Sequence, residues 1–281
     1  MASIKDKLLA IGAALAYPQV RLKPAITKEH FSGKWVLVTG ASHGIGRALT
    51  EKLIEADANV FLIARSEADL QYLCDRAKQR GNCADYCAID LRDREKLELL
   101  CQKIKETLPQ LDYFFCNAGK SIHRKITDAL DRLHDYDRTI DLNYRALVAL
   151  SLALLPTLKA SKGSIVYSSS VSTRYPMAPG WSAYHASKCA ANTWCETANS
   201  EFAPLGIRVQ IAYLPLVHTA MSDVNERYRQ LPAYYPADAA NILLRLAIRK
   251  GKRYQPWWAK LSAPIAYLFA PIVHLFYKRM V

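Results

Sequence analysis

Short apolar segments rich in β-branched residues alternate along this chain with segments of helical length, and this alternation restricts the fold more than any other feature. The predicted strands lie at 35–39, 59–64, 84–89, 113–117, 164–169, 208–214 and about 253–257. The predicted helices lie between them at 46–57, 67–80, 93–108, 129–158, 182–202 and 236–249. Strand–helix–strand units with right-handed crossovers form a parallel sheet that is covered on both faces. The sequence therefore predicts a doubly wound α/β domain with its ligand crevice at the carboxyl ends of the strands.

The two ends of the chain differ from this domain. We assign residues 1–30 to an N-terminal amphipathic extension, 31–258 to the domain with a lid at 215–235, and 259–281 to a hydrophobic C-terminal arm. The apolar run within 4–17 is too short to span a bilayer, and prolines and a histidine interrupt the uncharged segment 261–277. The arm is expected to dock on a membrane surface or line an acyl channel, or to pack on its own domain or a partner subunit.

Lys and Arg outnumber Asp and Glu by 38 − 25 = 13, which favours anionic partners. The basic residues are spread along the chain without interleaved aromatics, so nucleic acid is not expected as a partner. The seven cysteines include no CxxC or Cys/His ligand spacing and are typical of reduced thiols in a cytoplasmic protein. No metal site is predicted.

A glycine-rich turn, Thr39-Gly40-Ala41-Ser42-His43-Gly44-Ile45-Gly46, follows the first predicted strand and leads into a helix. Glycine permits positive φ and close backbone approach, and the N-terminus of the helix attracts a pyrophosphate. A glycine turn also occurs in sheets that bind nothing, but this strand–turn–helix context is that of a Rossmann-type dinucleotide site. The predicted cofactor contacts here are Gly40, Ser42, His43, Gly44, Ile45 and Gly46.

The second predicted strand ends in Ala64-Arg65-Ser66, without the acidic residue that binds the unmodified ribose of NAD. The guanidinium of Arg65 can pair with a 2′-phosphate, with Ser42 and His43 as helpers, which favours NADP(H) as the cofactor. The alternative is that Arg65 only begins a solvated loop.

Tyr184 and Lys188 are four residues apart and hence on one face of the helix predicted at 182–202. A cation beside a phenol stabilises the phenolate and lowers its pKa, which makes tyrosine a usable general acid or base. Such pairs also occur on ordinary exposed helix faces. The run 167–170 (YSSS) ends the preceding strand, where a serine hydroxyl can hydrogen-bond a substrate carbonyl as charge develops on its oxygen.

In the order and spacing of its motifs, the chain resembles the short-chain dehydrogenase/reductase family over about residues 31–255. The resemblance rests on 39–46, 117–119, Asn143, the serine run, Tyr184 with Lys188, and 215–219. It implies that Tyr184 donates the proton, that Lys188 holds the nicotinamide ribose while lowering the tyrosine pKa, and that Ser170 orients the carbonyl. Asn143 would hold a water in the proton relay. Further cofactor contacts implied by the resemblance are Asp90, at the adenine, and Asn117, Ala118, Gly119, Pro215 and Thr219.

Two positions depart from the family pattern. Ser170 lies fourteen residues before Tyr184, one more than the commoner family spacing, so Ser169 is a rival for the orienting role. Pro215 is followed by Leu216 where the family usually has glycine, which puts the course of the loop that carries Thr219 in doubt.

The segments 117–124, 131–144 and 214–221 resemble the reductase domain of bacterial fatty acyl-CoA reductases. This implies NADPH-dependent reduction of the carbonyl of a long hydrophobic substrate, a fatty acyl-CoA thioester or an aldehyde. The alternatives are a reductase or dehydrogenase of a keto-lipid, 3-oxoacyl chain, retinoid or steroid and, in another class, a non-catalytic NADPH-binding regulatory protein. A homo-oligomer, dimer or tetramer, formed through 129–158 and 182–202 is expected from the same resemblance, and the cytoplasmic protein is expected to contact a membrane peripherally through its arm.

Overall fold

The computed structural model describes residues 12–108, 110–224 and 226–279, and its centre is one sheet of seven parallel strands. The strand order is β3-β2-β1-β4-β5-β6-β7, so the direction of winding reverses between β1 and β4. Ligands of doubly wound sheets bind at this reversal. The predicted doubly wound α/β fold is confirmed, with strands β1 Trp35–Thr39, β2 Asn59–Ala64, β3 Ala84–Ala88, β4 Tyr113–Cys116, β5 Ser164–Ser170, β6 Arg208–Leu214 and β7 Arg253–Tyr254.

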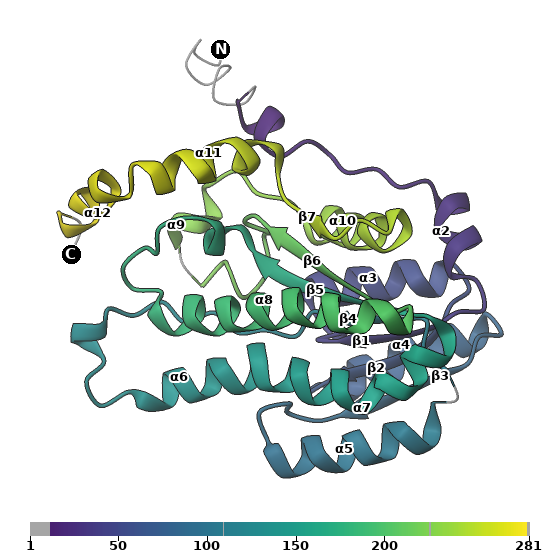
Figure 1. Cartoon of the computed structure of the whole chain (residues 1–281). Coiled ribbons are helices and arrows are strands. Elements are labelled where there is room, and N and C mark those ends of the chain that lie inside the picture. Colours follow the sequence, from purple (N-terminus) through teal and green to yellow (C-terminus); the bar gives the residue numbers. More distant parts are fainter. Residues whose placement is uncertain (1–11, 109, 225, 280–281) are drawn as a thin grey trace.

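Helices cover both faces of the sheet, as Figure 1 shows. Alternate strand side chains enter two separate apolar cores, for example Val36 and Val38 on one face and Leu37 on the other. One core is closed by α3 Gly44–Glu55, α4 Glu67–Gln79 and α10 Pro236–Arg249. The other is closed by α5 Arg94–Thr107, α7 Ala146–Ser161 and α8 Ser182–Phe202. Strands buried on both faces explain the continuous apolar runs in the sequence.

Two predicted elements differ in the structure. The long helix predicted at 129–158 begins only at α6 Leu133–Ile140, after a 3₁₀ turn at Ile126–Asp128, and a π-helical turn, Asp141–Arg145, joins it to α7. The strand predicted near 253–257 is two residues long, because Pro256 has no N–H to give to a sheet and instead precedes a helix.

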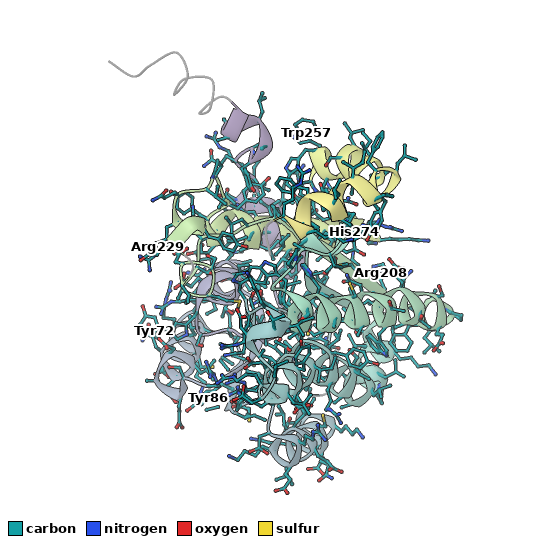
Figure 2. The ribbon with its side chains drawn as sticks, turned by 90° about the vertical axis from the view of Figure 1, so that its left-hand side faces the viewer. Tyr72, Tyr86, Arg208, Arg229, Trp257 and His274 are labelled. Atoms are coloured by element: carbon teal, nitrogen blue, oxygen red, sulfur yellow. The ribbon has the colours of Figure 1, made fainter. Side chains whose placement is uncertain are left out.

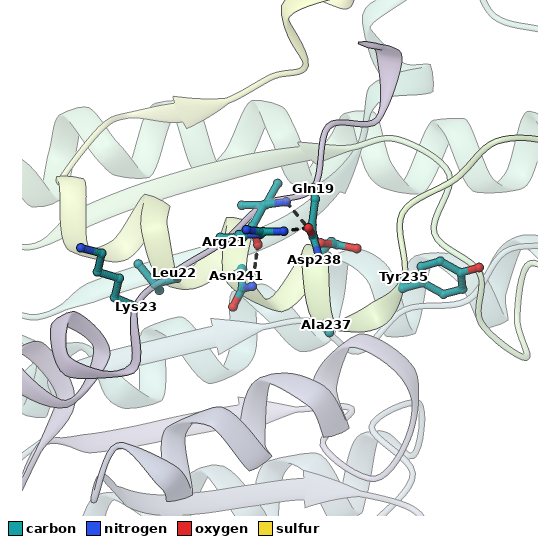
Figure 3. Close-up of a pocket in the computed structure, with 9 residues that line it drawn as sticks. Gln19, Arg21, Leu22, Lys23, Tyr235, Ala237, Asp238 and Asn241 are labelled. Atoms are coloured by element: carbon teal, nitrogen blue, oxygen red, sulfur yellow. Dashed lines mark hydrogen bonds between the residues drawn. The ribbon is translucent and has the colours of Figure 1, made fainter. Parts of the chain in front are cut away.

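The N-terminal extension is partly built into the domain. Its first eleven residues lie outside the described part of the chain, and 12–16 are helical. The following strap crosses α10 (Figure 3), where the Val20 N–H donates to Asp238 Oδ1 (3.2 Å) and Asn241 Nδ2 donates to the Val20 carbonyl (2.6 Å). Helix α2 Pro24–Phe31 ends in Phe31, which is fully buried. The hollow beside the strap in Figure 3 is lined by none of the predicted catalytic residues.

The C-terminal arm forms α11 Trp257–Leu268 and α12 Ala270–Lys278, which extend along one edge of the molecule, with the start of α11 beside residues 12–16 (Figure 1). Within the described residues, no single helix is long and apolar enough to cross a bilayer. Helices α11 and α12 reach that length and composition only when they are taken together, and a bend of 83° separates them.

Candidate active site

The glycine turn between β1 and α3 leaves no room for side chains. Gly40 and Gly44 have φ of +69° and +54°, in the left-handed region that favours glycine. A Cβ on Gly46 would lie 2.0 Å from the Gly40 carbonyl oxygen. No side chain caps the N-terminus of α3, so its backbone N–H groups remain available to an anion. The turn therefore fits the pyrophosphate of a dinucleotide.

The end of β4 lies directly beside this turn. Thr39 Oγ1 accepts hydrogen bonds from the backbone N–H groups of Asn117 (3.0 Å) and Ala118 (3.1 Å). A Cβ on Gly40 would lie 3.0 Å from Ala118 Cα, and one on Gly119 would lie 3.4 Å from the Lys188 ammonium nitrogen. The glycine turn, the 117–119 segment and Lys188 thus form one continuous crevice at the switch point of the sheet.

Tyr184 and Ser170 meet at the mouth of this crevice. Ser170 is the last residue of β5, Tyr184 lies in the first turn of α8, and a hydrogen bond joins their side chains. Burial raises the pKa of the Tyr184 phenol above its ordinary value, whereas the hydrogen bond from Ser170 acts to lower it. The phenol is therefore protonated at neutral pH and placed to donate.

Lys188 lies one turn after Tyr184 on α8 and is only 5% exposed. Its ammonium group donates to the Ser168 carbonyl (2.8 Å) and lies 4.7 Å from the centre of the Tyr167 ring. Burial lowers its pKa to about 8, although Cys116 and Cys195 act in the opposite direction. The resemblance implies that Lys188 lowers the tyrosine pKa. In this structure the ammonium donates to Ser168, and burial, the largest influence on Tyr184, raises the pKa of the phenol.

Asn143 lies inside the π-helical turn and is almost fully buried. Its Oδ1 accepts from the Lys120 N–H (2.8 Å), while its Nδ2 donates to the Lys120 carbonyl (2.9 Å) and to Ser187 Oγ (2.9 Å). A Cβ on Gly119 would lie 3.3 Å from Asn143 Oδ1, so the amide lines the same crevice as Lys188. π-Helical turns within α-helices are frequent at functional sites.

The neighbouring serines point in different directions. Ser169 Oγ is buried and donates to Asn192 Oδ1 (2.6 Å), behind the reacting groups. Ser170 Oγ contacts Ser172 Oγ (2.9 Å) in addition to Tyr184. Of the two rivals, Ser170 is therefore the one whose hydroxyl shares a site with the phenol.

Several cations surround the adenosine end of the predicted cofactor site. Arg65 follows β2 and is exposed, as the sequence predicted. The pKa of Lys120 is lowered, and burial is the largest cause. The positive charges of Arg138, Arg92 and Arg65 lower it further. The carboxylate of Asp90 is bound by Arg92, through Nε to Oδ1 (2.9 Å) and Nη2 to Oδ2 (2.5 Å), which lowers the pKa of Asp90.

On the other side of the turn, Ser42 is buried and its hydroxyl contacts His43 Nδ1 (2.8 Å). His43 Nε2 lies 3.7 Å from an Asp69 carboxylate oxygen, and Arg47 also pairs with Asp69 (3.3 Å). The exposed His43 side chain and Arg47 thus border the same carboxylate near the ends of β1 and β2.

The loop after β6 reaches the glycine turn despite the departure at Leu216. Pro215 is buried, and Thr219 Cγ2 would lie 3.2 Å from a Cβ on Gly44. Ser222 fixes the loop, because its hydroxyl accepts from the Thr219 N–H (2.9 Å) and donates to the Val217 carbonyl (2.9 Å). Thr219 therefore lies beside the glycine turn, where the sequence placed it as a cofactor contact.

Two groups of residues near Tyr184 were missed from the sequence. The Trp181 ring packs edge-on against Tyr184 (6.0 Å between centres), stacks on Tyr228 of α9 Glu226–Arg229 (6.0 Å), and lies 4.6 Å from His123. These rings form an aromatic wall, defined here as His123, Trp181 and Tyr228. The only sequence signal for the wall is that Trp181 lies three residues before Tyr184, since His123 comes from the loop after β4 and Tyr228 from the distant short helix α9.

The second missed group is a hydrogen-bonded chain that leads to Ser170. Ser172 Oγ contacts both Ser170 Oγ (2.9 Å) and His185 Nε2 (3.1 Å). His185 is buried, burial lowers its pKa, and its Nδ1 has no partner among the described residues. A buried unpaired N–H costs more than an unpaired lone pair, so the neutral ring carries its proton on Nε2. His185 then donates to Ser172, Ser172 donates to Ser170, and the Ser170 proton is free for the site.

Comparison with known proteins agrees with this geometry. A family model described as short chain dehydrogenase matches residues 34–229. A fatty acyl-CoA reductase of Acinetobacter baylyi is 34% identical over 251 residues, 89% of this chain and 84% of that protein. A fatty acyl-CoA reductase of Mycobacterium tuberculosis is 32% identical over 241 residues, 85% of this chain and 82% of that protein.

Solved structures share the fold. A short-chain dehydrogenase from Streptomyces avermitilis has a TM-score of 0.72 at 25% identity and covers 86% of this chain and 96% of its own. A metagenomic short-chain oxidoreductase in complex with NADP has a TM-score of 0.67 at 25% identity, with 80% and 96% covered. With a glycine turn, a buried lysine and a serine–tyrosine pair in one crevice, this chain belongs to the short-chain dehydrogenase/reductase family of oxidoreductases and is similar to fatty acyl-CoA reductases.

Proposed function

We propose that this protein uses NADPH to reduce the carbonyl group of a long-chain hydrophobic substrate, a fatty acyl-CoA thioester or the corresponding aldehyde. The observation that carries the proposal is the hydrogen bond between the Ser170 and Tyr184 side chains beside the crevice, with Lys188 buried directly beneath. When NADPH is bound, it supplies the hydride for the carbonyl carbon. The protein supplies the proton for the oxygen.

Each residue of the site has a separate role in this reaction. The Ser170 hydroxyl donates a hydrogen bond to the carbonyl oxygen and stabilises the negative charge that develops there. The protonated Tyr184 phenol gives its proton to the same oxygen, and the Lys188 ammonium and the Asn143 amide provide a path for its replacement. The Ser172 hydroxyl keeps the Ser170 proton directed into the site.

The preference for NADPH is supported by charge. Arg65 stands at the end of β2, and the charges of Arg92 and Arg138 act on the same neighbour, Lys120. Guanidinium groups bind phosphate oxygens in a bidentate manner, so this side of the crevice suits a 2′-phosphate. A similar structure, the metagenomic oxidoreductase, contains NADP.

The substrate class is supported by the aromatic wall and by the relatives. Trp181 and Tyr228 place apolar ring faces beside the reacting phenol, which favours a hydrophobic chain over a small polar substrate. The similar proteins from Acinetobacter baylyi and Mycobacterium tuberculosis are both fatty acyl-CoA reductases.

The test is a turnover assay with the full chain. NADPH oxidation is measured with long-chain acyl-CoAs, long-chain aldehydes, keto-lipids and steroids, and Tyr184→Phe is compared with the wild type. We expect turnover with an acyl-CoA or aldehyde, and a loss of about 10²–10⁴-fold in kcat in the variant, as is usual for removal of a general acid. NADPH affinity should not change.

Three outcomes would contradict the proposal. Activity confined to keto-lipids or steroids would exclude the thioester and aldehyde substrates. Equal activity of Tyr184→Phe would remove the role of the phenol. Tight NADPH binding without turnover of any substrate would indicate a regulatory protein.

A further inference from the structure

The large apolar side chains of the C-terminal arm are exposed, whereas a helix that only packs on its own domain buries such side chains. The residues of α11 that are buried against the domain are small, Ala259 and Ala263. In α12 no residue is buried. The large side chains point outward and are more than half exposed: Trp257, Leu261, Ile265, Tyr267, Leu268, Phe269, Ile272, Leu275 and Phe276. We call these nine residues the apolar face of the arm. Single exposed apolar residues are ordinary, but a contiguous group marks an interaction site.

The N-terminal helical segment joins this face. Trp257 Nε1 donates to the Leu15 carbonyl (2.9 Å), and Trp258 Nε1 donates to the Ala16 carbonyl (3.0 Å). Leu15 is itself 62% exposed. Residues 15–16 and the start of α11 therefore adjoin, and Figure 2 shows Trp257 at the top of the molecule, between the N-terminal helical segment and the arm.

The charged residues of the C-terminal part of the chain are all basic. From residue 239 to the end, the sequence has eight Lys and Arg residues and no Asp or Glu. Among them, Lys260 lies on α11, and Lys278 and Arg279 lie at the end of α12, all of them exposed. Apolar rings and aliphatic side chains with a basic border are typical of helices that lie in the interface of an anionic bilayer. The 83° bend between α11 and α12 suits helices that lie along a surface.

The arm also contacts residues 175 and 176, which follow Ser170 in the chain. The hydroxyl of Tyr175 lies 2.5 Å from Ser262 Oγ in α11, and Tyr267 donates to the Tyr175 carbonyl (3.2 Å). Tyr277 of α12 donates to the Pro176 carbonyl (3.3 Å). Residues 175 and 176 follow the 3₁₀ turn Val171–Arg174, which begins next to Ser170. A surface that is bound by the arm would therefore lie close to the segment that leads to the reacting groups.

We propose that the apolar face of the arm, with Leu15, inserts into the interface of an anionic lipid bilayer, and that the protein works while attached to that surface. The bilayer is then the source of its hydrophobic substrate. Attachment itself does not depend on the proposed reaction, since it rests on the arm and not on Tyr184.

The experiment is flotation of the purified full chain with vesicles. Vesicles of phosphatidylcholine alone are compared with vesicles that also contain phosphatidylglycerol, at low and high salt. We expect binding to the anionic vesicles, weaker binding to the neutral ones, and weaker binding as salt rises. The double variant Ile265→Glu/Ile272→Glu should weaken the partition by about a hundredfold or more, since each buried isoleucine contributes on the order of a tenfold factor.

The matched control is Leu99→Glu, which puts the same charge on an exposed leucine of α5, outside the arm. It should bind vesicles like the wild type. Circular dichroism and NADPH affinity, equal in all three proteins, show that the variants are folded. The inference is overturned if the wild type does not float with anionic vesicles, or if the double variant floats equally well. It is also overturned if the double variant changes only the oligomer size, because a second copy of the chain then covers the face. Enzyme activity is not a readout here, so failure of the proposed reaction would leave the vesicle result unchanged.

Discussion

At neutral pH, the buried charge of Lys188 should lower the free energy of unfolding, although the proposed reaction needs this residue. The ammonium is only 5% exposed, has one hydrogen bond, to the Ser168 carbonyl, and faces no carboxylate among the partners described for it. Burial lowers its pKa from 10.5 to about 8. A lowered pKa of a basic group means that the folded state binds the proton less well than the unfolded state does. Replacement by Met, which has a similar length and no charge, removes this cost.

The size and pH dependence of the cost follow from the two pKa values. Below about pH 8 both states carry the proton, and the full cost applies, about 3 kcal/mol at about 1.4 kcal/mol per pKa unit. As the pH rises from about 8 toward 10.5, the folded state loses the proton first, and the cost disappears. The stability of the wild type relative to Lys188→Met should therefore increase by about 2 kcal/mol between about pH 7 and about pH 9.5.

Urea unfolding of both proteins at several pH values measures this difference. The Lys188 charge acts on the thiols of Cys116 and Cys195, but burial raises their pKa values, to about 12 for Cys116, so both thiols stay protonated in the folded proteins up to about pH 9.5. The remaining titrations are common to both proteins and cancel in the subtraction. Lys159→Met, at an exposed position of α7, is the control and should show no such slope. A difference between wild type and Lys188→Met that stays constant with pH would refute the reasoning, because it would mean that the buried amine is not desolvated. Turnover of Lys188→Met should be lost even though the variant is no less stable than the wild type at neutral pH.

Three more substitutions test the rest of the site. Gly46→Ala puts a methyl group 2.0 Å from the Gly40 carbonyl oxygen. The Tm of the variant should fall, with a loss of about 1–3 kcal/mol in the free energy of unfolding, and added NADPH should raise this Tm less than that of the wild type. A wild-type Tm with the full rise on addition of NADPH would contradict the close approach. Arg65→Ala should weaken NADPH binding by roughly 10–100-fold, the value of a charged hydrogen bond, and leave NADH binding unchanged; equal losses for both cofactors would exclude a 2′-phosphate contact. Ser172→Ala frees the Ser170 hydroxyl to rotate and should lower kcat by about tenfold without changing NADPH affinity, whereas an unchanged kcat would show that the chain from His185 has no positioning role.

Much of this structure is predictable from local patterns. The alternation of apolar strands and helices predicted the sheet, because the five inner strands, β2, β1, β4, β5 and β6, are buried on both faces and so carry recognisable apolar runs. The glycine turn could also be predicted, since Gly40 and Gly44 adopt positive φ at a strand–helix junction, where glycine is favoured. The four-residue spacing of Tyr184 and Lys188 placed both on the crevice side of α8.

What the sequence did not reveal depends on contacts between distant segments. Burial raises the pKa of Tyr184 and the hydrogen bond with Ser170 acts to lower it, and neither effect can be read from the four-residue spacing of Tyr184 and Lys188. Trp181 and Tyr228 stack although they belong to different loops. The ion pair between Asp90 and Arg92 was not predicted, although the two residues are only two positions apart in the chain.

The π-helical turn at Asp141–Arg145 makes the site sensitive to chain length as well as to residue type. A π-helical turn holds one residue more than the α-helical turn it replaces, so deletion of one residue here would restore regular winding and leave the phase of α6 relative to α7 nearly unchanged. The contact of the Tyr136 hydroxyl with Ser182 Oγ at the start of α8 (2.8 Å) would then survive, whereas Asn143, which lies inside the turn, would leave the crevice. A deletion of a single codon at this turn should therefore be more damaging than most substitutions along the same helix.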